Sequence, residues 1–132
     1  MGLAVGNGLV FEAINDAIAI SETNGTPLIL AALSALYDVA PAATVDPMTG
    51  HIVSFGPLLS DPRIYYDSNN GFFIITVIEV DRNPATGNLA SGSHVLIAVL
   101  PNNLSAINLF SLDVTNDGDA ALGACPCFGI NL

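Results

Sequence analysis

Oxygen-bearing side chains gather in one short run toward the end of the sequence, where they could bind a hard cation. The run DVTNDGD supplies Asp113, Asn116, Asp117 and Asp119, and Ca²⁺ prefers carboxylate and amide oxygens as ligands. The run is not an EF-hand, because Ala124 stands where that loop needs a bidentate glutamate. It is therefore the candidate for an irregular calcium site, although a solvated Asn-Asp-Gly turn is the more common structure for such a sequence.

Two cysteines and two histidines are candidates for softer metal ligands. Cys125 and Cys127 are separated by a single proline, so they match neither the C-x-x-C redox motif nor a complete zinc set, and a disulfide between them would be strained. His51 and His94 could complete a Cys₂His₂ site, but no spacing rule supports that combination. The sequence favours cysteines that are buried, strained against each other or paired with residues outside this segment.

The charge balance excludes several classes of partner. Asp and Glu number 12 against two basic residues, Arg63 and Arg82, which gives a formal net charge of −10 without any lysine. Two arginines cannot form the cationic surface that binds a nucleic acid backbone or an anionic membrane, so cations are the small partners that the charge favours. The longest apolar window, residues 28–36, has nine residues. A membrane-spanning helix needs about 20, so no membrane span is expected.

Residues 61–115 contain four consecutive strand patterns. The segments DPRIYYD, FFIITVIEVD, SHVLIAVL and INLFSLDV are rich in β-branched and aromatic residues, and Gly, Pro, Asn and Asp separate them. Consecutive strands joined by short connections pair most simply as an antiparallel meander. We therefore predict an all-β fold with a complete four-stranded meander over residues 61–115.

The second of these strand patterns is apolar on both of its faces. One face would carry Phe73, Ile75 and Val77, and the opposite face would carry Phe72, Ile74, Thr76, Ile78 and Val80. A sheet with one face in water should alternate polar and apolar residues, so this pattern predicts a sheet that has a layer on each side. A blade of a β-propeller has that position. A β-sandwich is the alternative architecture.

The rest of the chain is expected to be less regular, within one all-β unit of residues 1–132. Residues 1–40 contain further strand patterns and a hairpin signal at Asn24-Gly25. We interpret them as a partial first blade, in which residues 28–39 form either a helix or a strand followed by an irregular excursion. A linker loop is expected over residues 41–60, and a loop-like tail over residues 116–132.

Four motifs occur in a fixed order along the chain: SDPRIYYDSNNGFFIITVIEVD, SHVLIAVL, FSLDVTNDG and CPCFG. Together they resemble a group of secreted or cell-surface bacterial proteins predicted to be β-propellers. The resemblance implies about two blades of a longer propeller and a secreted or surface location, but no activity, because the group has no settled biochemical function. The sequence departs from the group at Phe72, where Arg-Trp usually follows the turn glycine, and after CPCFG, where a further blade usually follows.

The Asp-Pro step at Asp61 also resembles the opening motif of five-bladed glycoside hydrolases, which implies Asp61 as a general base at the mouth of an axial channel. Hydrolysis would need a second carboxylate as the acid, because protonating the leaving oxygen and activating water are separate tasks. Glu12, Glu79 and Asp113 are the candidates, and their spacing selects none of them. The alternative role for Asp61 is structural, as a cap of the turn into the strand and a partner of Arg63.

These observations favour a non-catalytic extracellular module, binding or structural, over a glycan-hydrolysing propeller. The sequence contains no G-x-S-x-G elbow, phosphate loop or H-E-x-x-H motif, and a glycan is a candidate ligand only through the hydrolase resemblance. Hydrophobic residues make up 52% of the chain, and no lysine protects an exposed strand edge. We therefore expect the module to bury its faces against copies of itself, as a homo-oligomer or filament, or against the remainder of a longer propeller.

Overall fold

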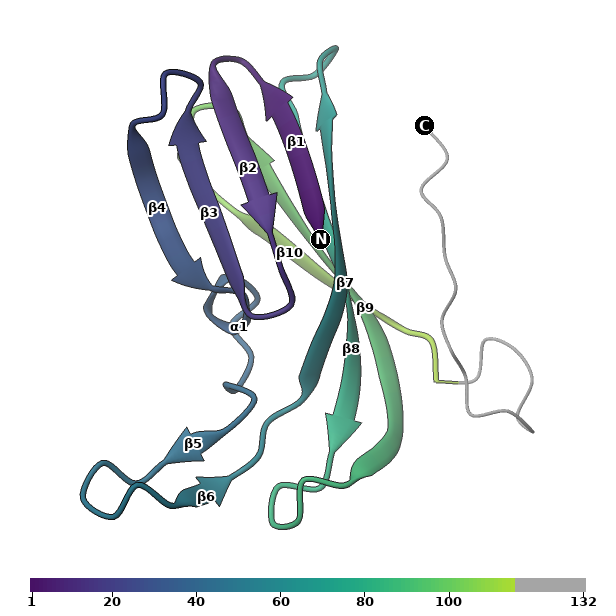
Figure 1. Cartoon of the computed structure of the whole chain (residues 1–132). Helices are drawn as coiled ribbons and strands as arrows, with labels where there is room; N and C mark the ends of the chain where they lie inside the picture. The colour runs from purple at the N-terminus through teal and green to yellow at the C-terminus, as the bar shows by residue number, and fades with distance from the viewer. Residues whose placement is uncertain (116–132) are drawn as a thin grey trace.

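The first part of the chain folds into a four-stranded antiparallel sheet. A computed structural model describes residues 1–115, and its first strands are β1 (Gly2–Gly6), β2 (Leu9–Ala13), β3 (Ala17–Glu22) and β4 (Pro27–Ala32). They lie in the order β1-β2-β3-β4 (Figure 1). Asn7 and Gly8 connect β1 to β2 and both have positive φ, as a tight primed hairpin turn requires. This first sheet has four strands, whereas the sequence indicated only a partial set.

The predicted meander forms the second four-stranded sheet. Its strands are β7 (Leu58–Asp67), β8 (Phe72–Arg82), β9 (Leu89–Pro101) and β10 (Asn108–Asp113), in the order β10-β9-β8-β7. In both four-stranded sheets each strand pairs only with its neighbours in sequence. The all-β fold and the antiparallel meanders are therefore confirmed, and no Greek-key connection joins these two sheets within residues 1–115.

The connection between the sheets contains short elements of its own. One helical turn, α1 (Leu33–Leu36), follows β4, and the hairpin of β5 (Thr44–Val45) and β6 (Ile52–Ser54) lies within the segment expected to be a linker loop. Arg82 fastens this segment to the second sheet, because its guanidinium donates hydrogen bonds to the carbonyl oxygens of Gly56 and Ala42. No helix in residues 1–115 has the length and apolar character needed to cross a membrane.

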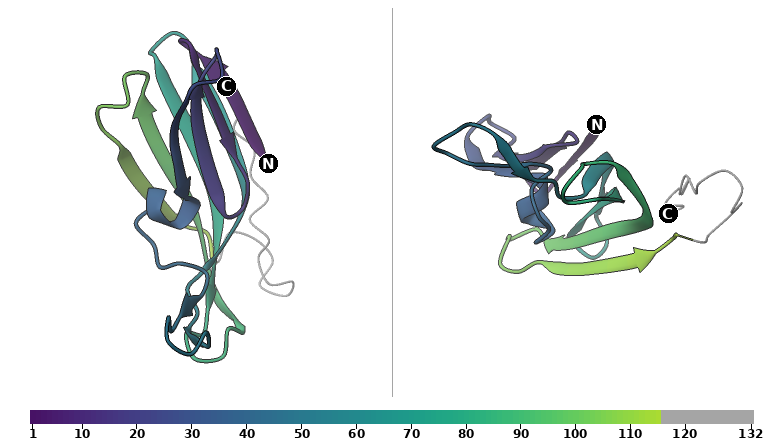
Figure 2. Two further views of the ribbon diagram at one scale, coloured as in Figure 1. Left: turned by 60° about the vertical axis from the view of Figure 1, so that its left-hand side comes forward. Right: turned by 90° about the horizontal axis from the view of Figure 1, so that it is seen from below.

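The hydrophobic core lies between the two sheets, which pack against each other face to face (Figure 2). The rings of Phe11 on β2 and Phe73 on β8 stack with their centroids 3.8 Å apart. Around them, every second side chain of the central strands is buried. The fully or nearly fully buried residues of this core are Phe11, Ala13, Ile18, Ile20, Leu33, Phe73, Ile75, Val77 and Ala98.

Strand β1 lies against β7 at the side of this core, and two glycines allow the close approach. A Cβ at Gly2 would lie 2.9 Å from the carbonyl oxygen of Pro62, and a Cβ at Gly6 would overlap the ring of Tyr66. Both distances are too short for a real side-chain carbon. The glycines of β1, which are poor strand formers by propensity, are therefore required by the contact between the sheets.

Tyr37 ties the segment after α1 to the second sheet. Its buried hydroxyl donates a hydrogen bond of 2.9 Å to the carbonyl oxygen of Ile75, and burial raises the pKa of this hydroxyl well above its ordinary value. The hydroxyl therefore stays neutral and able to donate at all physiological pH values. Its hydrogen bond holds the connection between the sheets over β8.

One buried hydroxyl in the second sheet gives a prediction about stability. Thr76 is 1% exposed, and its Oγ1 has no hydrogen-bond partner in the described part of the chain. Thr76→Val keeps the shape of the side chain and removes the unsatisfied hydroxyl, so we expect the free energy of unfolding to rise by about 1 kcal/mol in urea denaturation. Thr76→Ser, which keeps the hydroxyl and loses the methyl group, should lower it. A valine variant less stable than the wild type would contradict the assignment of Thr76 as unsatisfied.

Candidate metal centre

The antiparallel register of the second sheet aligns three titratable residues across three strands. Glu79 on β8 pairs with His94 on β9, and His94 pairs with Asp113 on β10. All three lie on the face that carries Phe73, Ile75 and Val77, because side chains alternate along a strand. They lie beyond the last core residue of β8, at the end of the sheet that carries the loop between β8 and β9.

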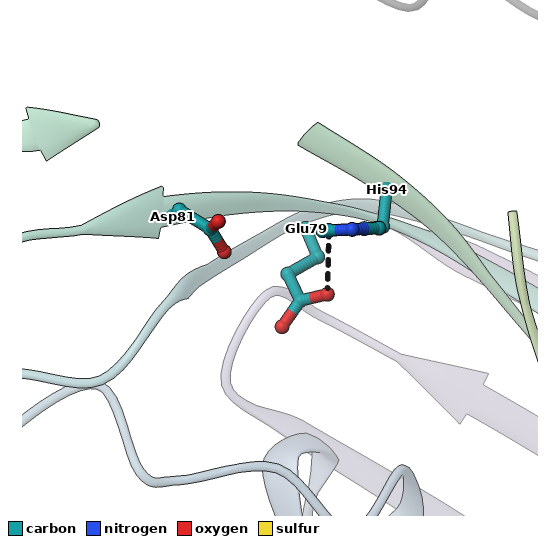
Figure 3. Close-up of side chains that lie close together, drawn as sticks. All are labelled: Glu79, Asp81 and His94. Carbon is teal, nitrogen blue, oxygen red and sulfur yellow. Dashed lines mark ion pairs between the residues drawn. The ribbon is translucent and has the colours of Figure 1, made fainter. Parts of the chain in front are cut away.

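Glu79, Asp81 and His94 converge into one cluster at this end of the sheet (Figure 3). Each offers one ligand atom, and these atoms lie within 4.8 Å of one another. Nδ1 of His94 lies 3.3 Å from Oε2 of Glu79. This nitrogen is buried and makes no hydrogen bond to any described residue, so the contact is an ion-pair distance without hydrogen-bond geometry.

Asp81 lies two residues after Glu79 on β8, so the two carboxylates share one face of the strand. The register between β8 and β9 shifts just beyond this point, where Val80 pairs with Ser93 but Arg82 pairs with Leu89. The partner strand has Gly92 beside this point, and a Cβ on Gly92 would overlap Oδ2 of Asp81. The absence of a side chain at Gly92 therefore makes room for the second carboxylate.

The carboxylate of Glu79 lies at a desolvated position in the cluster. Burial raises the pKa of Glu79, His94 opposes that rise, and the negative charge of Asp81 adds to it. Asp113 differs, because hydrogen bonds from the side chain and backbone of Thr115, and then the charge of His94, lower its pKa. Charge repulsion between Glu79 and Asp81 is the kind of strain that a bound cation relieves.

The three ligand atoms could hold a metal ion. Two ligands that bind one tetrahedral ion at about 2.1 Å are about 3.4 Å apart, which matches the distance of 3.3 Å between His94 and Glu79. Imidazole suits Zn²⁺ and other transition metals, whereas carboxylates also suit Mg²⁺, Ca²⁺ and Mn²⁺. A mixed set of two carboxylates and one imidazole therefore admits both groups of cation.

The predicted calcium ligands are only partly within the described structure. Asp113 lies at the end of β10, where its Oδ1 accepts a hydrogen bond of 2.9 Å from the backbone N–H of Thr115. Asn116, Asp117, Asp119, Cys125 and Cys127 lie outside the described residues. The candidate site found here shares only the neighbourhood of Asp113 with the predicted one.

The carboxylates considered for hydrolysis do not gather around Asp61. Asp61 is exposed, has a φ of 50° and lies where the register of β7 shifts, and no ion pair joins it to Arg63 in residues 1–115. Glu12 is exposed on β2, on the side of the first sheet away from the core. Only Glu79 belongs to the cluster described above, and its neighbours there are Asp81 and His94.

Sequence reasoning named Glu79 and His94 in separate roles and did not name Asp81 as a ligand. The available signal was the E-x-D pattern at the end of one strand followed by a histidine at the start of the next. In a hairpin such residues share a face if the register is right. His51, the other histidine, is exposed beside the β5–β6 hairpin and takes no part.

Comparisons with models of protein families, with curated proteins and with solved structures gave no match to this chain. The interpretation of the site therefore depends on its geometry.

Proposed function

We propose that this chain is a non-catalytic, cation-binding β module of a secreted or cell-surface protein. The observation that carries the proposal is the convergence of Glu79, Asp81 and His94 at one end of the sheet pair. The raised pKa of Glu79 and the glycine that admits Asp81 support it. The role is structural or adhesive, and the module contacts copies of itself or the remainder of a longer propeller.

The ligand set favours a transition metal such as Zn²⁺ over Ca²⁺. Calcium takes six to eight oxygen ligands, whereas this cluster offers a buried imidazole nitrogen beside its two carboxylates. Calcium remains the cation proposed for the run that begins at Asp113, where the sequence supplies oxygen ligands alone. We therefore propose Zn²⁺ for the cluster of Glu79, Asp81 and His94, and Ca²⁺ for the separate run that begins at Asp113.

The test is thermal melting and calorimetry of the chelator-treated protein with Zn²⁺ and, separately, with Ca²⁺. A ligand that binds only the folded state adds about 2.7 kcal/mol at a concentration 100 times its Kd, so Zn²⁺ should raise the Tm. Asp81→Asn should abolish this rise, because it removes the charge that the cation neutralises. Asp16→Asn, at an exposed carboxylate outside the cluster, is the matched control and should keep the rise. No heat and no Tm shift with either cation would end the proposal.

The pH dependence of the Zn²⁺ effect adds a second readout. The pKa of Glu79 is raised in the folded state, so its contribution to stability is present below the ordinary carboxyl pKa and is lost as the pH rises through the folded value. A bound cation compensates for that loss and competes with protons for Glu79 and His94. The Tm shift should therefore be larger at about pH 7 than at about pH 4.

A further inference from the structure

The first sheet has an apolar face that points away from the core. One row of paired residues crosses all four strands on this face and consists of Leu3, Glu12, Ala19 and Leu30. Val5 and Val10 form a second pair beside this row. Leu30 is 81% exposed, and Leu3 and Val5 are also exposed. These six residues define the first outer face, on which Glu12 is the one charged member.

The second sheet has a matching apolar face on its own far side. Across its strands Arg63 pairs with Thr76, Thr76 with Ile97, and Ile97 with Phe110, while Tyr65 pairs with Ile74 in the next row. Phe110 is 55% exposed and Tyr65 is also exposed. Arg63, Tyr65, Ile74, Ile97 and Phe110 define the second outer face, on which Arg63 is the basic member, while Asp67 lies at the far end of the same face of β7.

The two outer faces are complementary in charge. The chain has two basic residues, and one of them, Arg82, already binds the carbonyl oxygens of Gly56 and Ala42 and lies over the ring of Phe55. Arg63 is exposed and forms no ion pair with any residue in 1–115. Glu12 is likewise exposed and without an ion pair within the same range. The first outer face therefore presents a single anion among apolar residues, and the second presents one unpaired cation, Arg63, among apolar residues.

We propose that a second copy of this chain packs its first outer face onto the second outer face, with Glu12 of one copy paired with Arg63 of the next. The occupant is a copy of the chain because one molecule carries both halves of the contact. The packing repeats what the chain does internally, where its first sheet already stacks on its second through apolar strand faces. The inference rests on the assembly role proposed above and is independent of the cation.

The charges determine the direction of assembly. A contact between two first outer faces would offer Glu12 no cation from the other copy's face, and a contact between two second outer faces would offer Arg63 no Glu12. A charge that is buried at an interface without an opposite partner disfavours such pairings. The favoured contact is therefore head-to-tail, which leads to a ring if the rotation closes and to a filament if it does not. The net charge of −10 opposes indiscriminate association and leaves the specific pair to set the register.

The experiment is sedimentation velocity of the full chain in chelator, with charge-reversal variants. The wild type should associate at micromolar concentration. Glu12→Arg and Arg63→Glu should each raise the concentration of half-assembly by about tenfold or more, because attraction becomes repulsion. An equimolar mixture of the two single variants should return to the wild-type range, since each then meets an opposite charge on the other. The double variant, which restores opposite charges in every contact, should do the same.

Several outcomes would overturn the proposal. A wild type that stays a 13.6 kDa monomer at these concentrations shows that copies do not cover the outer faces. Single variants that assemble like the wild type, or a mixture that assembles no better than either single variant, show that Glu12 and Arg63 do not meet. Leu30→Lys, at the most exposed position of the first outer face, is a further variant that should weaken assembly without touching the core. Far-ultraviolet circular dichroism confirms folding of each variant, and calorimetry with Zn²⁺ shows whether the cation proposal stands or fails separately.

Discussion

Replacing Phe73 with alanine is expected to lower the free energy of unfolding by about 3–5 kcal/mol, the range typical of aromatic truncation in a protein core. Phe73 has no exposed surface, and its ring packs against Phe11 of the first sheet and Tyr66 of β7. Alanine would leave a cavity between two sheets whose backbones are held by their own hydrogen bonds and cannot collapse onto it. Urea denaturation followed by circular dichroism measures the loss.

The neighbouring phenylalanine provides a matched control for this prediction. Phe72 lies on the opposite side of β8 and is 37% exposed, so Phe72→Ala should cost much less than Phe73→Ala when both are measured on dilute protein. Equal losses would mean that the sheets are not joined through the stacked rings. The comparison therefore tests the face assignment of β8, which is the basis of the whole arrangement.

The sequence predicted the second sheet well because its signals agree with one another. Phe73, Ile75 and Val77 are all fully buried on one face of β8, as the alternation indicated, and turn residues mark the ends of β7 and β8. Within residues 1–115 the first sheet covers this face. The other face is only partly buried, since Thr76 is 1% exposed but Phe72 is 37% exposed. The apolar residues on the other face are the reason to propose a second copy there.

The first sheet was harder to predict, because its edge strand β1 has few strand-forming residues. Two of the five residues of β1 are glycine, and glycine is depleted in strands by propensity. Its conformation is set instead by contacts with β7, which lies more than 50 residues away in the sequence. Local patterns do not report such contacts. The position of the one-turn helix α1 was also hard to predict. The Leu- and Ala-rich composition that favours a helix begins in the preceding segment, which forms strand β4.

The candidate site could not be assembled from sequence because it depends on a register of single-residue accuracy. The strand patterns alone do not determine which residue of β8 faces His94. In the structure His94 pairs with Glu79, and Val80 pairs with Ser93. A shift of one residue moves a side chain to the other face of a sheet. The spacing of Glu79 and Asp81 places both on one face of β8, but the role of Gly92 beside them appears only once the strands are paired.

Gly6→Ala is expected to lower the free energy of unfolding by about 1–3 kcal/mol, as overpacking a close contact does. The added carbon would overlap the ring of Tyr66, and the atoms that it meets belong to the ring, which is itself packed on Phe73. The ring cannot move without disturbing the core. Restricting the unfolded chain by exchanging glycine for alanine stabilises by only about 0.4–1 kcal/mol, so the clash decides the sign.

A double-mutant cycle separates this clash from a simple strand-propensity effect. Tyr66→Leu removes the ring that the new Cβ would meet, so the loss caused by Gly6→Ala should shrink by at least about 1 kcal/mol in the Tyr66→Leu background. If Gly6→Ala costs the same in both backgrounds, β1 does not lie against β7 as described. The need for glycine at this position would then come from local conformation alone. A positive coupling instead shows that the contact between the two sheets requires glycine here.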